Sequence, residues 1–282
     1  MHSKKITQGF CFGLLRCAAF VNALALGILI YFLIINGISA ISWEFLTQPP
    51  KNMMTQGGIM PCIIGTFLLS FGAMLVALPL GIGSAIYLNE YARPGRLLRL
   101  IRLGINNLAG VPSIVFGLFG LAFFATQLKF KVSLLTGMFT LGFLTLPVVI
   151  SATEEALKAV PSTYREASLG LGATKWQTIY KVVLPAALPG ILTGAILSLS
   201  RAAGETAAIM YSAAVFYSPK LISSILEPVM ALPYHIYVLA TAGTEIEKTR
   251  PLQYGTALVL ITLIFGMNFI AIYYRAKMQK KY

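Results

Sequence analysis

An arginine and a glutamate lie four residues apart inside a long apolar stretch of the chain. Arg201 and Glu205 are separated by Ala-Ala-Gly204, within the apolar run from Leu184 to Tyr211. An arginine at the centre of a membrane helix costs about 2.5–3.5 kcal/mol on insertion scales, so its side chain should face a partner or a water-filled path. In a continuous helix, residues at i and i+4 share one face, and we expect the two side chains to pair.

The chemistry that suits this pair is the passage of an anion. The guanidinium fork of Arg201 can bind a tetrahedral oxyanion through two hydrogen bonds. Glu205 would hold the arginine in position and compete for it when no anion is bound, and Gly204 would let a ligand approach the backbone. We interpret Arg201, Glu205 and Gly204 as a candidate translocation site, with a purely structural ion pair as the alternative.

A second polar segment, between Pro161 and Pro185, has the residues of a helical hairpin. Two pairs with the S/T-x-x-E/Q spacing of a capping box predict two helix starts: Thr163 with Glu166, and Thr174 with Gln177. Gly170 and Gly172 lie between them, and glycine readily adopts the left-handed conformation that ends a helix. The segment predicts a short helix, a tight turn and a second helix that Pro185 joins to the next apolar stretch. Any connection between two spans needs such residues, so this pattern alone assigns no function.

Composition places these segments in a membrane protein. The chain has 282 residues, of which 57% are hydrophobic and 11% charged, with a mean hydropathy of +0.78. Crossing about 30 Å of hydrocarbon takes roughly 20 apolar residues in a helix. Six apolar runs qualify: 17–38, 62–88, 104–126, 134–156, 184–212 and 253–274. The expected fold is all-α, a polytopic bundle of six transmembrane helices.

The net charge of +13 follows the expected topology and does not indicate nucleic-acid binding. Most basic residues fall in four segments that six spans would place on one side: Lys4, Lys5 and Arg16; Arg93, Arg96, Arg99 and Arg102; Lys158, Arg165, Lys175 and Lys181; Arg275, Lys277, Lys280 and Lys281. Because short cytoplasmic loops carry an excess of Lys and Arg, both termini and the hairpin are expected in the cytoplasm.

Three regions follow from this arrangement. Residues 1–61 form a first span and an external loop, 62–274 hold five spans, and 275–282 form a basic cytoplasmic tail. Within the external stretch 216–251, residues 226–242 predict an interfacial helix; a seventh span there is the alternative. Gly190 and Gly194 have the spacing that permits close packing of two membrane helices.

The residues for ATP hydrolysis are missing. The sequence has no Gly-x-x-x-x-Gly-Lys-Ser/Thr phosphate loop, and all nine acidic residues are glutamates. A site that needs an aspartate on magnesium cannot be built from this chain, so ATP-driven transport would require a separate ATPase. No cofactor or metal site is expected, and the chain itself is not expected to be an enzyme.

The hairpin resembles the cytoplasmic loop of importer-type ABC permeases, which docks on the ATPase subunit. The loop signature is Glu-Ala-Ala, three residues, Gly, nine residues, Ile-x-Leu-Pro, and five positions match: Glu166, Ala167, Gly172, Leu184 and Pro185. Ser168 and Val182 replace an alanine and an isoleucine of similar size. This resemblance implies the type I ABC-importer permease fold.

The Arg-Ala-Ala-Gly-Glu-Thr run that begins at Arg201 is similar to that of phosphate-specific permeases, and stretches 79–91 and 107–115 resemble their PstA-type subunit. The resemblance covers nearly the whole chain. It implies import of inorganic phosphate across the cytoplasmic membrane by a complex with a PstC-type permease, two ATPase copies and an external phosphate-binding protein. In that family the arginine and glutamate are linked to phosphate passage, and they correspond to Arg201 and Glu205.

Two other functions remain open from the residues. A permease of the same class for sulfate or molybdate would need the same oxyanion chemistry. A secondary transporter that works without ATP would need ion-coupling carboxylates at mid-membrane, where only Glu205 qualifies, and it would leave the hairpin without a purpose.

Overall fold

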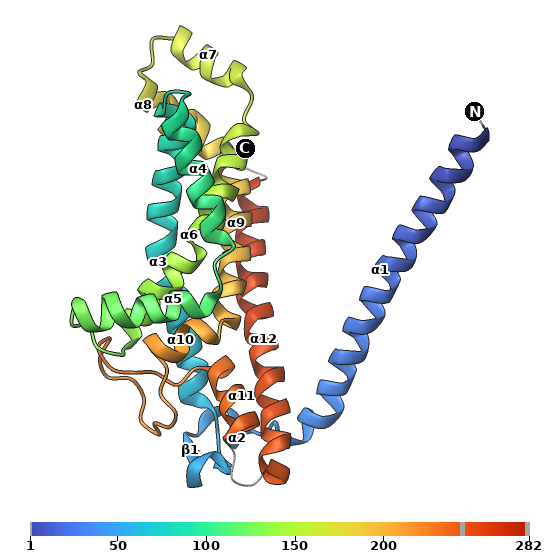
Figure 1. Ribbon diagram of the computed structural model, residues 1–282, viewed down its shortest axis with the longest axis vertical. Helices are drawn as coiled ribbons and strands as arrows, with labels where there is room; N and C mark the ends of the chain where they lie inside the picture. Colours follow the sequence, from blue (N-terminus) through green and yellow to red (C-terminus); the bar gives the residue numbers. More distant parts are fainter. Residues whose placement is uncertain (1, 243–245, 280–282) are drawn as a thin grey trace.

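Two long helices that run in the same direction form the centre of the fold. In the computed structural model, which describes residues 2–242 and 246–279, α3 (Met60–Ile86) lies beside α6 (Leu134–Lys158) (Figure 1). Gly72 of α3 lies against Met138 of α6, and Gly81, further along α3, lies against Val149. Residue numbers increase in the same direction along both helices, so α3 and α6 are parallel. The segment between them must therefore return the chain to the end of the bundle where α3 begins.

A third helix, α9 (Leu184–Gly204), packs antiparallel on α6. A Cβ atom added at Gly190 would lie 2.6 Å from Cβ of Ala156, and one added at Gly194 would lie 2.4 Å from Cβ of Ala152. These distances leave no room for a side chain, which confirms the close helix approach predicted from the Gly190–Gly194 spacing. The main core lies between α3, α6 and α9 and includes Leu69, Leu141 and Ala202.

The return crossing between α3 and α6 is a bent pair of helices. After a one-turn π-helical segment η3 (Tyr87–Tyr91), α4 (Arg96–Ala109) is followed by α5 (Ser113–Phe119) and its π-helical continuation η4 (Gly120–Gln127), with a bend of 102°. The span expected over 104–126 is therefore not one continuous helix, and it counts as a sixth span only if the bent pair is taken as one. Pro112 explains the break, because proline lacks an N–H and disfavours the helical conformation in the residue before it.

The fifth predicted span, 184–212, also differs from the structure at both ends. The helix begins earlier, since α8 (Lys175–Thr178) and the π-helical turn η5 (Ile179–Val183) lead directly into α9. It ends at Gly204, because Glu205 has an extended backbone (φ −75°, ψ 127°), and the short helix α10 (Ala207–Ser212) follows. In the part of the chain that the structure describes, five helices are long and apolar enough to span a membrane, or six if the bent pair counts as one.

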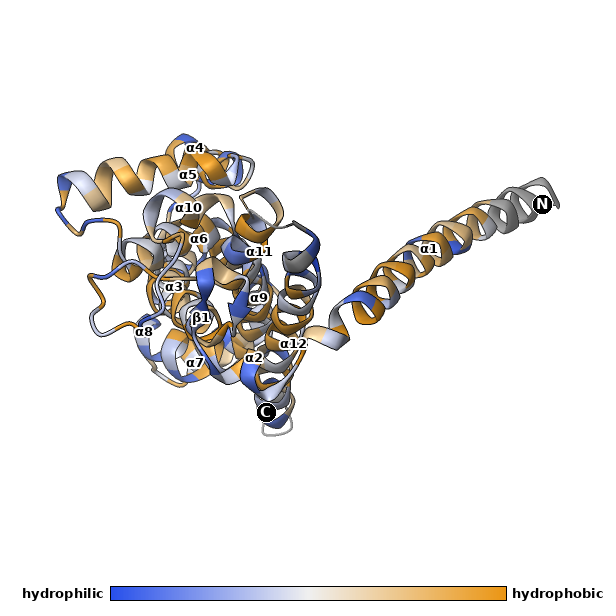
Figure 2. Cartoon of the chain, turned by 90° about the horizontal axis from the view of Figure 1, so that it is seen from below, coloured by the Kyte–Doolittle hydropathy of each residue, from blue (hydrophilic) through white to orange (hydrophobic). Residues whose placement is uncertain are grey.

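The first and last helices lie at the edge of the bundle. α1 (His2–Gly37) contacts α12 (Ile246–Gln279) near its end, where the rings of Phe32 and Tyr254 meet edge to face at 5.5 Å. From there α1 diverges from the bundle (Figure 1), and most of its apolar side chains between Phe12 and Ile35 are exposed. The coloured part of this helix is largely hydrophobic (Figure 2). α12 continues through residues 275–279 of the predicted tail, whereas Lys280 and Lys281 lie outside the described residues.

The segments between the long helices close one end of the bundle. They comprise η1 (Ile38–Ala40), α2 (Trp43–Thr47), the two-residue strands β1 (Pro50–Lys51) and β2 (Gln56–Gly57) around η2 (Asn52–Met54), and α11 (Leu232–Thr241). With 10 residues, α11 is too short to span a membrane, so the alternative of a seventh span there is not supported. The sequence predicts a helix over 226–242, but residues 226–231 are not helical; the position of α11 at the membrane interface stays a prediction.

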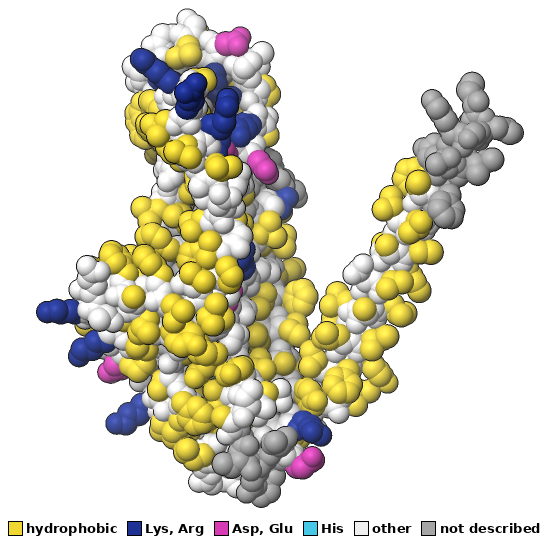
Figure 3. Space-filling view, in the orientation of Figure 1, with side chains coloured by type: hydrophobic (Ala, Val, Ile, Leu, Met, Phe, Trp, Pro, Cys, Tyr) yellow, Lys and Arg dark blue, Asp and Glu magenta, His cyan; other side chains and the backbone are white. Residues whose placement is uncertain are grey.

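The opposite end of the bundle carries the basic residues. There the start of α1, the start of α4, the hairpin and the end of α12 lie at the same end (Figure 1). Lys and Arg side chains gather around the hairpin, while hydrophobic side chains cover the long sides of the bundle (Figure 3). This separation of charge from apolar surface is what a protein surrounded by lipid requires.

Candidate functional site

The predicted helical hairpin exists and protrudes from the basic end of the bundle. α7 (Ser162–Gly170) is followed by a turn and then by α8 (Figure 1). The turn is a Schellman motif: the N–H of Gly172 donates to the carbonyl oxygen of Leu169 at 2.9 Å, and the N–H of Ala173 donates to that of Ser168 at 3.2 Å. Gly172 has φ +85°, a left-handed conformation that favours glycine, whereas Gly170 is the last residue of α7.

One of the two predicted capping boxes is present. Thr174 accepts a hydrogen bond from the N–H of Gln177, and the Gln177 side chain accepts one from the N–H of Thr174, so α8 begins as predicted. The box predicted for Thr163 and Glu166 is wrong. Because α7 already begins at Ser162, with Pro161 at its N-cap position, Thr163 lies inside the first turn and cannot act as the cap.

The hairpin presents apolar side chains beyond the long spans. Leu171 at its tip is 90% exposed, and Tyr164 and Trp176 are more than half exposed. Tyr164, Ala167 and Leu171 help to line a largely apolar hollow of about 440 Å³ between α7, the turn and η5. Exposed apolar surface of this kind is typical of regions that contact another protein or a membrane.

The structure separates the five residues of the predicted loop signature into two groups. Glu166 and Ala167 are exposed on α7, and Gly172 forms the turn. Leu184 and Pro185 are half-buried at the start of α9, beyond the π-helical turn. The signature therefore runs from the protruding hairpin into a helix that packs on α6.

The intramembrane pair differs from the prediction. Among the described residues there is no ion pair or hydrogen bond between the side chains of Arg201 and Glu205, because α9 ends at Gly204 and Glu205 no longer continues the helix. Arg201 instead lies in the last turn of α9, where a positive charge is stabilised by the carbonyl end of the helix dipole.

Arg201 and Gly204 lie on an exposed stripe of α9. Gly190 and Leu197 belong to the same stripe, whereas the opposite face of the helix is buried against the core. Glu205 is partly exposed next to it. An arginine facing hydrocarbon is costly, so this stripe is suited to a water-filled path or to another protein chain and not to lipid tails.

The helix break after Gly204 lies next to the other broken segment. A Cβ atom added at Gly117 of α5 would lie within 3.0 Å of the carbonyl oxygens of Ala207 and Ala208, so α5 packs directly on α10. Interrupted helices at membrane depth are tolerated where they are covered by protein or line a cavity, and they are common at substrate paths.

Sequence analysis missed two ion pairs at the basic end. Arg165 at the base of the hairpin contacts Glu90 at the end of α3, at 2.8 Å, and Arg102 of α4 contacts Glu154 of α6 at 3.4 Å. The partners lie 75 and 52 residues apart in sequence, so spacing could not reveal them. The one signal was an acidic residue, Glu90, immediately before the arginine-rich segment.

Comparison with known proteins agrees with the fold. Residues 77–281 match the family described as "Binding-protein-dependent transport system inner membrane component". The chain is 33% identical to a probable ABC transporter permease, YqgI, of Bacillus subtilis (strain 168) over 291 residues, covering 99% of this chain and 98% of YqgI. It is 39% identical to the phosphate transport system permease PstA 1 of Mycobacterium tuberculosis (strain ATCC 25618 / H37Rv) over 216 residues, covering 76% and 68% of the two chains.

Two solved transporters share the fold at low sequence identity. The methionine ABC transporter MetNI, in an inward-facing conformation, matches with a TM-score of 0.58 at 22% identity, covering 78% of this chain and 94% of that chain. A bacterial importer of the acidic polysaccharide alginate matches with a TM-score of 0.61 at 14% identity, covering 89% and 94%. These confirm the all-helical type I importer fold. The chain belongs to the binding-protein-dependent transport system inner membrane component family: it is the multi-pass, non-catalytic permease subunit of an ABC importer that works with separate ATPase subunits and a periplasmic binding protein.

Proposed function

We propose that this permease imports inorganic phosphate, and that Arg201 lines the path of the anion. The observation that carries the proposal is the position of Arg201 on the exposed stripe of α9, in the last turn before this helix ends at Gly204. Among the described residues no carboxylate pairs with this guanidinium, so its N–H groups can donate two hydrogen bonds to one tetrahedral oxyanion. The relatives named as phosphate transport permeases support phosphate over other oxyanions.

The role of Glu205 is to balance this charge. In the structure it is close in sequence to Arg201 but is not paired with it among the described residues, and its extended backbone removes it from the helical face of the arginine. A small rotation at Gly204, which has no atom within 4 Å of an added Cβ, would let the carboxylate approach the guanidinium. In this proposal Glu205 competes with the anion for Arg201 and displaces it after passage.

The proposal gives the α7–α8 hairpin the role of contact with the ATPase. The hairpin protrudes from the bundle and presents both polar and apolar groups. These are the exposed Glu166, the turn at Gly172 and the apolar hollow next to Leu171. The continuous path from α8 through η5 into α9 would carry a displacement of the hairpin to Arg201. The proposed partners are a PstC-type second permease, a pair of ATPase subunits and a phosphate-binding protein.

Uptake of labelled phosphate by cells that lack the chromosomal copy of this chain tests the assignment. The parent protein should restore uptake of phosphate but not of labelled sulfate. Arg201→Ala should abolish phosphate uptake while the complex still assembles, and Arg201→Lys should restore only part of it, because a point charge lacks the fork. Sulfate or molybdate uptake in place of phosphate would transfer the function to that anion, and normal phosphate uptake by Arg201→Ala would remove Arg201 from the path.

A further inference from the structure

The hairpin is attached to the bundle without a hydrophobic core of its own. Each of the nine residues of α7, all of them described, is exposed or only partly buried. Across the hairpin, the hydroxyl groups of Ser168 and Thr178 are 2.9 Å apart, which ties α7 to α8. Two further contacts anchor the hairpin: Lys175 of α8 lies over the ring of Tyr91 in η3 at 5.0 Å, and a polar cluster at the base of α7 centres on Arg165.

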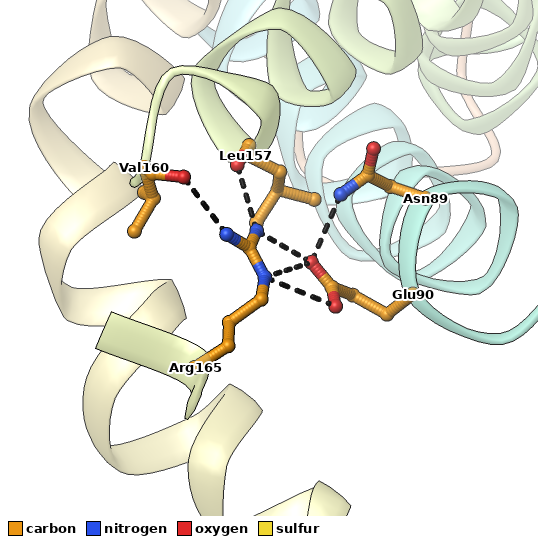
Figure 4. Close-up of polar contacts among 5 residues, drawn as sticks. All are labelled: Asn89, Glu90, Leu157, Val160 and Arg165. Atoms are coloured by element: carbon orange, nitrogen blue, oxygen red, sulfur yellow. Dashed lines mark hydrogen bonds and ion pairs between the residues drawn. The ribbon is translucent and has the colours of Figure 1, made fainter. Parts of the chain in front are cut away.

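Arg165 joins three structural elements (Figure 4). Nη1 donates to the carbonyl oxygen of Val160 at 2.8 Å, and Nη2 donates to that of Leu157 at 2.9 Å, at the end of α6. Nη2 and Nε both donate to the carboxylate of Glu90, at 2.8 Å and 3.3 Å to the same oxygen. The guanidinium therefore closes the elbow between α6 and α7 and links that elbow to the end of α3.

Glu90 is held for this contact. It lies in η3, and its side chain is only 9% exposed. Asn89 donates a hydrogen bond to Glu90 Oε1 at 2.9 Å, so the carboxylate has a second fixed neighbour (Figure 4). A carboxylate that is this well buried is stable only when it is paired and hydrogen-bonded, so removing Arg165 would leave an uncompensated charge at the end of α3.

The other ion pair at this end is built less tightly. Glu154 of α6 contacts Arg102 at 3.4 Å and Lys158 at 3.2 Å, each through a single contact, and both cationic side chains are more exposed than Arg165. Neither contact involves the hairpin. Of the ion pairs within residues 2–242 and 246–279, the one between Arg165 and Glu90 is thus the one that connects the hairpin to α3.

We propose that Arg165 and Glu90 form a rigid joint through which the hairpin moves α3. The proposal rests on the proposed role of the hairpin as the ATPase contact. The chain itself connects the hairpin only to α6 and α9. Two other links to α3 exist: Lys175 of α8 lies over the ring of Tyr91 at 5.0 Å, and α3 packs on both α6 and α9. The Arg165–Glu90 contact differs from these links because it combines an ion pair with hydrogen bonds of fixed geometry. Arg165 and Glu90 are positioning residues: they touch neither ATP nor the transported anion, and they set the ratio of transport to ATP hydrolysis.

The test uses the complete transporter in proteoliposomes, with its ATPase and its binding protein. Uptake of labelled inorganic phosphate and release of phosphate from ATP, followed with a different label, are measured in the same vesicles for Glu90→Gln, Arg165→Lys and the double variant. Glu155→Gln is the matched control, because Glu155 is an exposed glutamate of α6 at the same end of the bundle. Yield of the assembled complex is recorded for each variant.

We expect Glu90→Gln and Arg165→Lys each to lower uptake per ATP hydrolysed by about tenfold or more, at parental complex yield and parental basal hydrolysis. The double variant should be no worse than the poorer single variant, because the two side chains act through one contact. Losses that multiply in the double variant, or a parental ratio in either single variant, would overturn the joint. If the Glu90→Gln transporter fails to assemble, the uptake-to-hydrolysis ratio of Arg165→Lys alone tests the joint. This variant keeps a positive charge beside Glu90 and loses only the planar guanidinium group.

The same measurement separates this inference from the proposed substrate. If the parent transporter hydrolyses ATP in response to the binding protein but takes up no phosphate, the substrate assignment fails. The joint is then tested by the stimulation of ATP hydrolysis by the binding protein. We expect Glu90→Gln and Arg165→Lys each to lose this stimulation and Glu155→Gln to keep it. A parental response in Glu90→Gln or Arg165→Lys would overturn the joint on this readout as well.

Discussion

At the scale of single residues, backbone conformation and charge assign the roles. Gly172 is required by its φ of +85° and not by crowding, because an added Cβ there would have no atom within 4 Å. The proposed role of Arg201 follows from its position on the exposed face of α9. The proposed role of Arg165 follows from its hydrogen bonds to four acceptor atoms, two backbone carbonyl oxygens and the two carboxylate oxygens of Glu90. Each role follows from a different physical cause, so each substitution has its own expected signature.

Replacing Gly172 with valine should uncouple the transporter. A β-branched residue in the left-handed region costs more than the 1–2 kcal/mol that is typical of other residues, so the turn between α7 and α8 should rearrange. We expect phosphate uptake to fall at least tenfold with complex yield unchanged. Gly170→Val is the matched control, because Gly170 is equally open but has an ordinary helical conformation. Equal uptake by the two variants would show that the turn geometry is unimportant.

His235 on α11 should make the protein sensitive to acid. Burial lowers the pKa of His235 from 6.5 to about 4, and its Nδ1 atom has no hydrogen-bond partner among the described residues. The folded state favours the neutral ring, whereas the unfolded chain binds a proton below about pH 6.5. Stability is therefore fully present above the unfolded pKa and is lost as the pH falls from about 6.5 toward 4.

The measurement is the thermal unfolding midpoint of the purified protein in detergent at pH 7.5 and pH 5.0. We expect His235→Leu to reduce the drop between the two values, and His2→Leu, the other histidine of the chain, to leave it unchanged. If His235→Leu showed the full parental drop, another group would be responsible for the acid sensitivity.

At the scale of elements, the positions of apolar runs were predictable and the interruptions were not. Hydropathy located the spans that became α1, α3, α6 and α12, because each is a single long run. It could not show the 102° bend at Pro112 or the helix end at Gly204, where local backbone preferences divide runs that remain apolar. The failed pairing of Arg201 with Glu205 has the same cause, since i,i+4 reasoning assumes an unbroken helix.

The contact between α6 and α9 gives a direct test of the packing. Gly194→Ala should destabilise the protein by about 1–3 kcal/mol, because the added methyl group would overlap Cβ of Ala152, 2.4 Å away. Ala152→Gly in the same chain should restore part of the loss. Gly266→Ala on α12 is the control, since nothing lies within 4 Å of its added Cβ.

These variants are compared by thermal unfolding in the same detergent. A midpoint for Gly194→Ala that equals that of Gly266→Ala would contradict the close approach of the two helices.

At the scale of the whole molecule, the distribution of charge and the shape of the bundle indicate the same orientation in the membrane. The hairpin, the start of α1, the end of α12 and most of the Lys and Arg side chains in view lie at one end of the bundle (Figure 1, Figure 3). The turns around β1 and β2, together with α11, lie at the other. By the positive-inside rule we propose that the hairpin end is cytoplasmic, where the ATPase subunits would reach it.

Thiol labelling of intact cells tests this orientation. In a protein whose Cys11, Cys17 and Cys62 are replaced by serine, Gln56→Cys should react with a reagent that cannot cross the cytoplasmic membrane, and Gly95→Cys should not. Both positions are exposed in the structure, so access to solvent is matched and only the side of the membrane differs. Labelling of Gly95→Cys without permeabilisation would invert the topology.

The central claim is that this chain forms the phosphate path of an ATP-driven importer. Its most direct test is the accumulation of labelled inorganic phosphate by proteoliposomes that contain the purified complete transporter, with ATP and the binding protein supplied on their proper sides. The account predicts accumulation against a gradient that requires ATP, is unaffected by excess sulfate or molybdate, and is lost in Arg201→Ala. Accumulation without ATP, or transport of sulfate or molybdate in place of phosphate, would contradict it.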